Sequence, residues 1–287
     1  MKVIDLHVHI FPDDVADAYI QNYSEHSGFR AQCGPTLDAL YESYAGVDVI
    51  HWVILQQWQT SVPFESKHLK YVGQFDRYYT KYYFYSFHPW LARIQARDER
   101  LLCFGGAHPE EPDREEEFER MVSEYGLRGL KLHPCMQMFF LNDRRLFPIY
   151  ERAEAIGLPV LAHTGGDPIR GMELYGHPRD LDEVASAFPN LRIIMAHFGI
   201  PFFDEAVELM RKHGNLVTDI SFTIEVIDPG QLCSLVREVG VDRVMFGSDY
   251  PFIEPKAAIR KVLELDLPDE DKEKILWRNA IQLLKRE

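Results

Sequence analysis

The chain has 287 residues, 46% of them hydrophobic and 26% charged, which suits a globular protein of one large domain or two ordinary ones. Its formal net charge of −14 argues against nucleic acid as a partner, because neutralising phosphates requires clustered Lys and Arg. Four widely spaced cysteines, no signal-peptide pattern and no apolar run near the ~20 residues of a membrane span predict free thiols in a cytoplasmic protein.

Short apolar runs rich in Val, Ile and Leu recur along the chain, and each is followed by an amphipathic helical pattern. The runs occupy residues 2–9, 47–57, 101–109, 127–134, 158–166, 191–199, 215–221 and 241–249. Alternating strands and helices are typical of parallel βαβ units, and eight such units predict a closed (β/α)8 TIM barrel formed by residues 1–287 as a single domain. An open doubly wound sheet is the alternative. It is disfavoured because the first strand ends in histidine and not in a Gly-x-Gly phosphate loop.

Residues 58–100 interrupt this rhythm between the second and third strands. The segment is dense in Tyr, Phe and Trp, above all over residues 71–90. It predicts an insertion that is either an aromatic wall over the pocket or the face of a homodimer, since Tyr and Trp favour interfaces. The alternative is a helical insertion whose aromatics are ordinary core. The tail, residues 267–287, predicts an amphipathic helix covering the outside or bottom of the barrel.

The first strand carries two histidines near its end. His7 and His9 point the same way because side chains alternate along a strand, and Asp5 is expected to share that direction. An H-x-H pair on its own does not distinguish a metal site from ordinary strand residues.

Further polar residues follow the other predicted strands. The set at strand ends comprises His7, His9, Lys131, His133, His163, His197 and Asp249. In a (β/α)8 barrel these ends converge on the face that carries active sites. Burying so many polar groups together without a ligand would cost several kcal/mol, and a bound cation removes that cost.

We therefore predict a divalent metal ion held by His7, His9, His163 and Asp249. Imidazole with carboxylate suits zinc, and equally manganese, iron, cobalt or nickel. A metal-bound water would have its pKa lowered to about 7, and Asp249 is placed to accept its proton. His197 is the candidate for a second acid or base, or for holding a carbonyl oxygen.

Six segments together resemble the amidohydrolase superfamily, and within it the amidohydrolase-related (amidohydrolase 2) branch. They are "DLHVHIFP", "GLKLHP", "LAHTGG", "FPNLRIIMAHFG", "MFGSDYPF" and "KILWRNAIQLL". The resemblance implies a (β/α)8 barrel with a divalent metal, usually zinc, and it assigns the same four residues as ligands. It aligns His197 with a sixth-strand histidine that is catalytic in mononuclear members and a ligand of the second metal in binuclear ones.

Lys131 is a third candidate catalytic residue. The resemblance allows it to be a carboxylated lysine that bridges two metals, as in binuclear relatives. It can also pair with Asp249 or with a substrate carboxylate. We favour one ion over two. His108 and His133 either line the pocket or cap a loop, and Cys135 has no partner that would make it a nucleophile.

The favoured function is a metal-dependent hydrolase that uses activated water on the ester, lactone or amide carbonyl of a small molecule. The alternative is a metal-dependent non-oxidative decarboxylase of an aromatic or enoic acid in the same site. A third possibility, a barrel that lost catalysis and serves in binding or assembly, is disfavoured by the intact ligand set. Arg30, Arg170 and Arg179 could bind a substrate carboxylate, although surface charges are the simpler interpretation.

Overall fold

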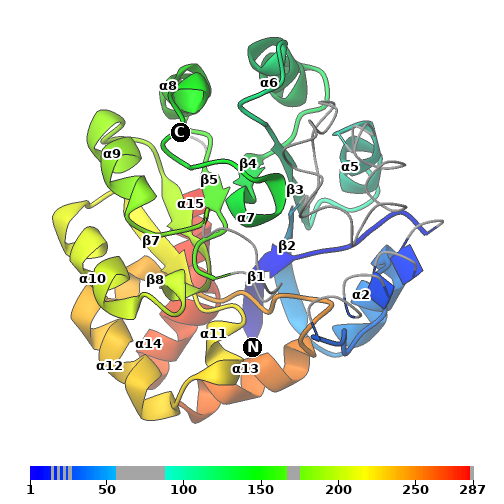
Figure 1. Ribbon diagram of the computed structural model, residues 1–287. Coiled ribbons are helices and arrows are strands. Elements are labelled where there is room, and N and C mark those ends of the chain that lie inside the picture. The colour runs from blue at the N-terminus through cyan, green and yellow to red at the C-terminus, as the bar shows by residue number, and fades with distance from the viewer. Residues whose placement is uncertain are drawn as a thin grey trace.

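Eight parallel strands form one sheet in which each strand is hydrogen-bonded to the next in chain order (Figure 1). The computed structural model describes residues 1–13, 16–17, 20–21, 24, 28–55, 88–166 and 175–284. The strands are β1 (Lys2–Val8), β2 (Asp48–Leu55), β3 (Leu101–Gly106), β4 (Gly129–Leu132), β5 (Val160–Ala162), β6 (Ile193–Met195), β7 (Leu216–Asp219) and β8 (Val244–Met245). Each lies within one of the eight apolar runs, so the (β/α)8 prediction is confirmed.

The barrel is closed by backbone contacts between β1 and the segment that follows β8. The amide of Leu6 donates to the carbonyl of Phe246 at 3.0 Å, and the amide of Asp249 donates to the carbonyl of His7 at 2.9 Å. A parallel bridge between Val8 and Tyr250 extends the contact. This seam brings Val8, the end of the first strand, next to Asp249, which lies 241 residues further along the chain.

Helices surround the strands in Figure 1. The longer ones are α2 (Leu37–Ser43), α5 (His88–Gln95), α6 (Arg114–Ser123), α8 (Phe147–Ala155), α9 (Asp180–Ala187), α10 (Phe203–Lys212), α12 (Pro229–Val239) and α13 (Pro255–Glu264). Single turns occur at α7 (Pro134–Gln137), η1 (Arg144–Leu146), η2 (Ala196–Gly199), α11 (Thr223–Val226) and η3 (Val241–Arg243). The chain ends in a continuous helical stretch of α14 (Asp269–Glu273), the π-helical η4 (Lys274–Arg278) and α15 (Asn279–Leu284).

Two apolar clusters fill the fold, one inside the barrel and one between strands and helices. The inner cluster includes Ile4, Leu6, Phe104 and Leu161 from the strands, and Ala280 and Leu283 from α15. Lys2 is the first residue of β1, and its Nζ lies 5.3 Å from the centroid of the Trp277 ring. The C-terminal helix therefore covers the end of the barrel at which the strands begin, as the prediction of a bottom cover requires.

One prediction for β1 is wrong: Asp5 does not face the same way as His7 and His9. The pairing with β2 shifts between Asp5 and Val8, so β1 carries an extra residue there. Leu6 consequently packs inside the barrel whereas Val8 packs outside it. This irregularity reverses the alternation and re-aims the strand, as a β-bulge does. Asp5 points outward to Tyr44, the residue that caps the end of α2, while the two histidines face inward.

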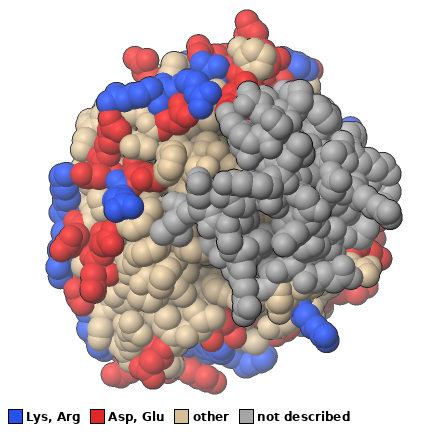
Figure 2. Space-filling model, in the orientation of Figure 1, with Lys and Arg blue, Asp and Glu red and all other residues tan. Residues whose placement is uncertain are grey.

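The aromatic-dense part of the predicted insertion, residues 58–87, lies outside the described residues, so the pocket wall and the homodimer face stay predictions. Of residues 88–100, α5 buries Leu91 and Ile94 in the outer cluster. Cys33, Cys103, Cys135 and Cys233 are free thiols, as predicted. None of the helices in the described ranges combines the length and apolar character needed to cross a bilayer. Figure 2 shows that Asp, Glu, Lys and Arg gather toward the periphery of the face in view.

Candidate active site

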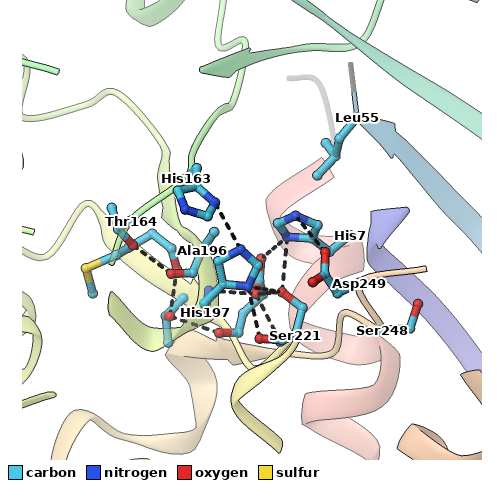
Figure 3. A network of polar contacts seen from close by, with 12 residues as sticks. His7, Leu55, His163, Thr164, Ala196, His197, Ser221, Ser248 and Asp249 are labelled. Carbon is cyan, nitrogen blue, oxygen red and sulfur yellow. Dashed lines mark hydrogen bonds and ion pairs between the residues drawn. The ribbon is translucent and has the colours of Figure 1, made fainter. Parts of the chain in front are cut away.

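The ends of the strands bring the predicted polar residues together in a buried cluster (Figure 3). His7 lies on β1 and His9 just beyond it, Lys131 on β4, His163 directly after β5, and His197 in η2 after β6. Asp249 follows β8. The histidines and Lys131 are buried, and the Asp249 side chain is 13% exposed. The convergence expected from the strand order is therefore present.

Asp249 faces two histidines from the first strand. Its Oδ1 lies 3.6 Å from Nε2 of His7 and 3.6 Å from Nε2 of His9. One ligand atom each from His7, His197 and Asp249 lie within 4.8 Å of one another. His163 reaches this group through His197, since its Nδ1 is 3.2 Å from Nε2 of His197. The tightest group thus contains His197, which the sequence assigned to catalysis, while His9 and His163 adjoin it.

The hydrogen bonds of His7 and His9 determine where their protons sit. Nδ1 of His9 lies 3.0 Å from the carbonyl of Leu55, and a carbonyl can only accept. Nδ1 of His7 lies 3.0 Å from Oδ2 of Asp219, which also accepts. Both histidines therefore donate from Nδ1, and in their neutral forms each keeps a lone pair on Nε2, next to the Asp249 carboxylate.

The same reasoning assigns the protonated ring nitrogen of His197 and of His163. Nδ1 of His197 faces the carbonyl of Ser221 at 3.0 Å, so it donates there and Nε2 carries the lone pair. That lone pair accepts from Nδ1 of His163, which leaves the lone pair of His163 on its own Nε2. The chain of hydrogen bonds therefore favours His163 over His197 as the residue with a free lone pair.

The resulting donor set fits a cation. Nε2 of His7 and Nε2 of His163 are buried without a hydrogen-bond partner among the described residues. Burial, and next the charge of Lys131, lowers the pKa of His9 to about 3 and that of His7 well below its usual value. These neutral imidazoles cannot satisfy the adjacent Asp249 carboxylate by protonation at neutral pH, whereas a divalent cation would bind lone pairs and carboxylate together.

Asp219 and Ser221 support this cluster, and the sequence analysis missed both. Asp219 accepts from Nδ1 of His7, from the amide of His197 at 3.0 Å and from the amide of Ser221 at 3.1 Å. The Ser221 hydroxyl also donates to it. The available signal was the segment "TDIS", which places an aspartate at the end of the seventh strand, in register with the other strand-end residues.

The backbone is held in the left-handed region at several positions of the site. His197 has φ 57°, Phe198 φ 52°, Phe222 φ 58° and Asp249 φ 65°. Non-glycine residues rarely adopt this conformation, and such strain clusters at functional sites because the surroundings enforce it. It directs His197 and Asp249 to positions that a regular strand end would not reach.

Lys131 is a charged group of the site for which the described residues supply no direct partner. Its neighbours Leu130 and Leu132 pack outside the barrel, so its side chain points inside. The Nζ atom has no hydrogen-bond partner among the described residues, and no ion pair joins it to Asp249. The predicted alternative of a Lys131–Asp249 pair is therefore wrong. Burial lowers the pKa of Lys131 to about 8, and Asp219 and Asp249 oppose that shift.

The remaining candidates have mainly local contacts. His108 bonds the carbonyl of Gln137 at 2.9 Å and the amide of Glu110 at 3.1 Å, which makes it a loop cap. His133 accepts from the amide of Met136 at the start of α7, and its ring stacks on His163 with centroids 4.0 Å apart. It therefore caps the loop, which is one of the two predicted roles, and its ring also lies against the histidine cluster. Arg30 and Arg179 are exposed, and Arg170 lies outside the described residues.

This (β/α)8 barrel has several histidines, an aspartate and a lysine at the ends of its strands. That arrangement is typical of enzymes with this fold. A family model described as amidohydrolase matches residues 4–286, and the chain belongs to this amidohydrolase family, as its motifs indicated.

Three comparisons add detail. The chain is 27% identical over 208 residues to 2-amino-3-carboxymuconate-6-semialdehyde decarboxylase from Dictyostelium discoideum, covering 59% of this chain but only 56% of that relative. A TIM-barrel protein from Bordetella bronchiseptica superposes with a TM-score of 0.77 at 20% identity, over 99% of this chain and 98% of that one. A dihydroxybenzoic acid decarboxylase from Polaromonas, solved with manganese and 2-nitroresorcinol, superposes with a TM-score of 0.68 at 15% identity, over 99% and 96% of the two chains.

Proposed function

We propose that the protein is a metal-dependent, non-oxidative decarboxylase of a small aromatic or enoic acid. The observation that carries the proposal is the pair of neutral Nε2 lone pairs on His7 and His9 that face the Asp249 carboxylate, with His197 in the same group of ligand atoms. The choice of decarboxylation over hydrolysis rests on the relatives. Of the three described above, the Dictyostelium and Polaromonas proteins have names that state an activity, and both are decarboxylases. The hydrolase that the sequence favoured is thus supported less well than its alternative.

In this proposal His7, His9, His163 and Asp249 hold one divalent ion. Zinc is the expected ion from the resemblance, and manganese is an equal candidate because the Polaromonas structure holds it. When bound, such an ion supplies a positive charge that binds the substrate carboxylate and a neighbouring oxygen. The Nδ1 hydrogen bonds of His7 and His9 keep their Nε2 lone pairs directed toward Asp249.

The reaction replaces a carboxylate by a proton at the same carbon: the bond to the carboxylate carbon breaks, CO2 leaves and C–H forms. Asp249 is the residue proposed to deliver that proton, because its carboxylate lies in the same cluster as His7 and His9. His197 is the second acid or base. Its Nδ1 donates to Ser221, so any proton exchange would take place at its Nε2, the nitrogen that accepts from Nδ1 of His163.

Assays of CO2 release test this function. Protein loaded with manganese or zinc is expected to release CO2 from hydroxybenzoates or enoic acids and to leave lactones and amides intact. His9→Ala should lower the bound metal and the rate of CO2 release by at least roughly 100-fold, because a metal supplies several kcal/mol of stabilisation.

The matched control is His51→Ala, which removes a histidine on β2 whose ring contacts the carbonyl of Arg100 away from the site. It should keep both metal and activity. Full activity in metal-stripped protein, or acid release from a lactone without CO2, would contradict the proposed function.

A further inference from the structure

Lys131 is the only lysine or arginine that is buried among the described residues. Its side chain is 1% exposed, and its Nζ has no hydrogen-bond partner in this part of the chain. Taking an ammonium group out of water costs several kcal/mol unless a partner compensates it. A site that retains such a group without a partner is arranged for a ligand that supplies one.

Of the two nearby carboxylates, that of Asp219 is already occupied. Both oxygens of Asp219 accept hydrogen bonds, Oδ2 from His7 and Oδ1 from His197 and Ser221. Asp249 directs Oδ1 toward His7 and His9. The two carboxylates act on Lys131 through space, and neither bonds to it. Within the described part of the chain, the Lys131 ammonium donors are therefore free.

The location of Lys131 limits what the missing partner can be. Lys131 on β4 pairs with Leu161 on β5. The side chain of Leu161 lies in the inner cluster, and His163 follows Leu161 by two residues. The charge of Lys131 acts on His7, His9, His133 and His163 together. A group bound at Nζ would therefore lie within the histidine cluster, where the substrate of the proposed reaction binds.

We propose that Lys131 is a substrate-binding residue that donates a hydrogen bond to an oxygen of the substrate other than those of the departing carboxylate. This inference rests on the proposed function. In the proposed function the ion would already bind the departing carboxylate, so the contact left for Lys131 is to a group that remains in the product. The substrate class is thus an acid with a hydroxyl or second carboxylate beside the reacting carbon.

Binding measurements on metal-loaded protein, made at times too short for detectable CO2 release, test this assignment separately from turnover. Salicylate carries a hydroxyl beside its carboxylate and benzoate lacks it, so the pair probes the second oxygen. Wild-type protein should prefer salicylate, and Lys131→Met should weaken salicylate binding by roughly 10- to 100-fold, the effect of one hydrogen bond to a charged group. Benzoate binding should change by less than roughly threefold, because it makes no such bond.

Two controls separate binding from folding and charge. Lys131→Met removes an uncompensated buried charge, so its thermal midpoint should equal or exceed that of the wild type. Lys2→Met removes the same charge from an exposed residue at the other end of the barrel and should leave both affinities unchanged. A large fall in the midpoint of Lys131→Met would assign the residue a structural role and overturn the inference.

Other results also decide the question. Equal weakening of salicylate and benzoate, or no weakening of either, would overturn the inference while CO2 release still supported the proposed function. A metal content that falls from two ions per chain to one in Lys131→Met would make the lysine a bridging ligand and overturn it too. The protein could also decarboxylate no acid and still prefer salicylate in a way that depends on Lys131. That result would support the Lys131 contact and contradict the proposed decarboxylase function.

Discussion

Asp219 is the residue on which the order of the site depends. It binds donors from three different parts of the chain, namely the ring of His7, the amide of His197 and the amide and hydroxyl of Ser221. A carboxylate that accepts from a histidine Nδ1 fixes the tautomer and the ring orientation, and it makes the opposite nitrogen a better ligand. Asp219 thus links the first strand to the turns after β6 and β7.

Asp219→Asn tests this role. The amide would offer a donor to Nδ1 of His7, which would move the His7 proton to Nε2 and remove the lone pair that faces Asp249. Metal affinity should fall by roughly 10- to 100-fold, the usual effect of losing such a supporting carboxylate. Competition with a chelator of known affinity measures the change.

Asp182→Asn is the matched control. Asp182 is a surface carboxylate that bonds Lys212 and His213 on the outside of the barrel. It should leave metal affinity unchanged. If Asp219→Asn bound the metal as tightly as the wild type, the tautomer of His7 would be set by something other than Asp219.

At the scale of elements, the loop after β8 carries Asp249 and approaches β1 and the turn after β7 very closely. A Cβ at Gly247 would lie 2.8 Å from Cβ of His7 and 3.0 Å from Cβ of Ser221. Real Cβ atoms are not found at such distances, and both neighbours are fixed to the backbone. Only glycine allows these three elements to meet beside the site.

Gly247→Ala should therefore push His7 and Ser221 apart. We expect a loss of about 1–3 kcal/mol in the free energy of unfolding, as for other insertions into packed regions, together with weaker metal binding. Denaturant titration and metal competition measure the two effects. Gly214→Ala adds the same methyl group where nothing lies within 4 Å, so it should change neither quantity. An unchanged metal affinity in Gly247→Ala would show that the close approach is not needed.

The elements were predictable from the sequence, but their irregularities were not. Apolar runs and helical patterns are local signals, and they located all eight strands. The bulge in β1 depends on how that strand pairs with β2, so the local alternation around Asp5 predicted the wrong face. The partners of Asp219 come from β1 and η2, and no spacing within "TDIS" specifies them. Both the β1 bulge and the hydrogen bonds of Asp219 depend on contacts between residues far apart in the chain, which local sequence patterns do not specify.

At the scale of the whole molecule, one buried carboxylate links the first strand of the barrel to the loop that follows the last strand. Asp5 accepts from the amides of His7 and Ser248, each at 2.9 Å, and from the hydroxyl of Tyr44 on α2. It therefore ties β1, the loop after β8 and an outer helix together at the seam. Burial raises the pKa of Asp5 to about 6, from 3.8 in its usual environment, and its hydrogen bonds only partly oppose this shift.

This shift predicts how stability depends on pH. Because the pKa of Asp5 is higher in the folded protein than in the unfolded chain, the folded state binds more protons between the two values. The contribution of Asp5 is thus most favourable below pH 4 and is lost as the pH rises to about 6, by about 3 kcal/mol in all. Asp5→Asn removes this ionisation and can retain the amide acceptor and the contact with Tyr44.

Urea unfolding of metal-free wild type and Asp5→Asn across this pH range measures the difference directly. Other titrating groups are shared by both proteins, so their effects cancel in the comparison. The stability of Asp5→Asn relative to wild type should increase as the pH rises from about 4 to about 6 and then level off. A difference that stays constant would mean that Asp5 is ionised throughout, so that the hydrogen bonds across the seam outweigh the cost of burying its charge.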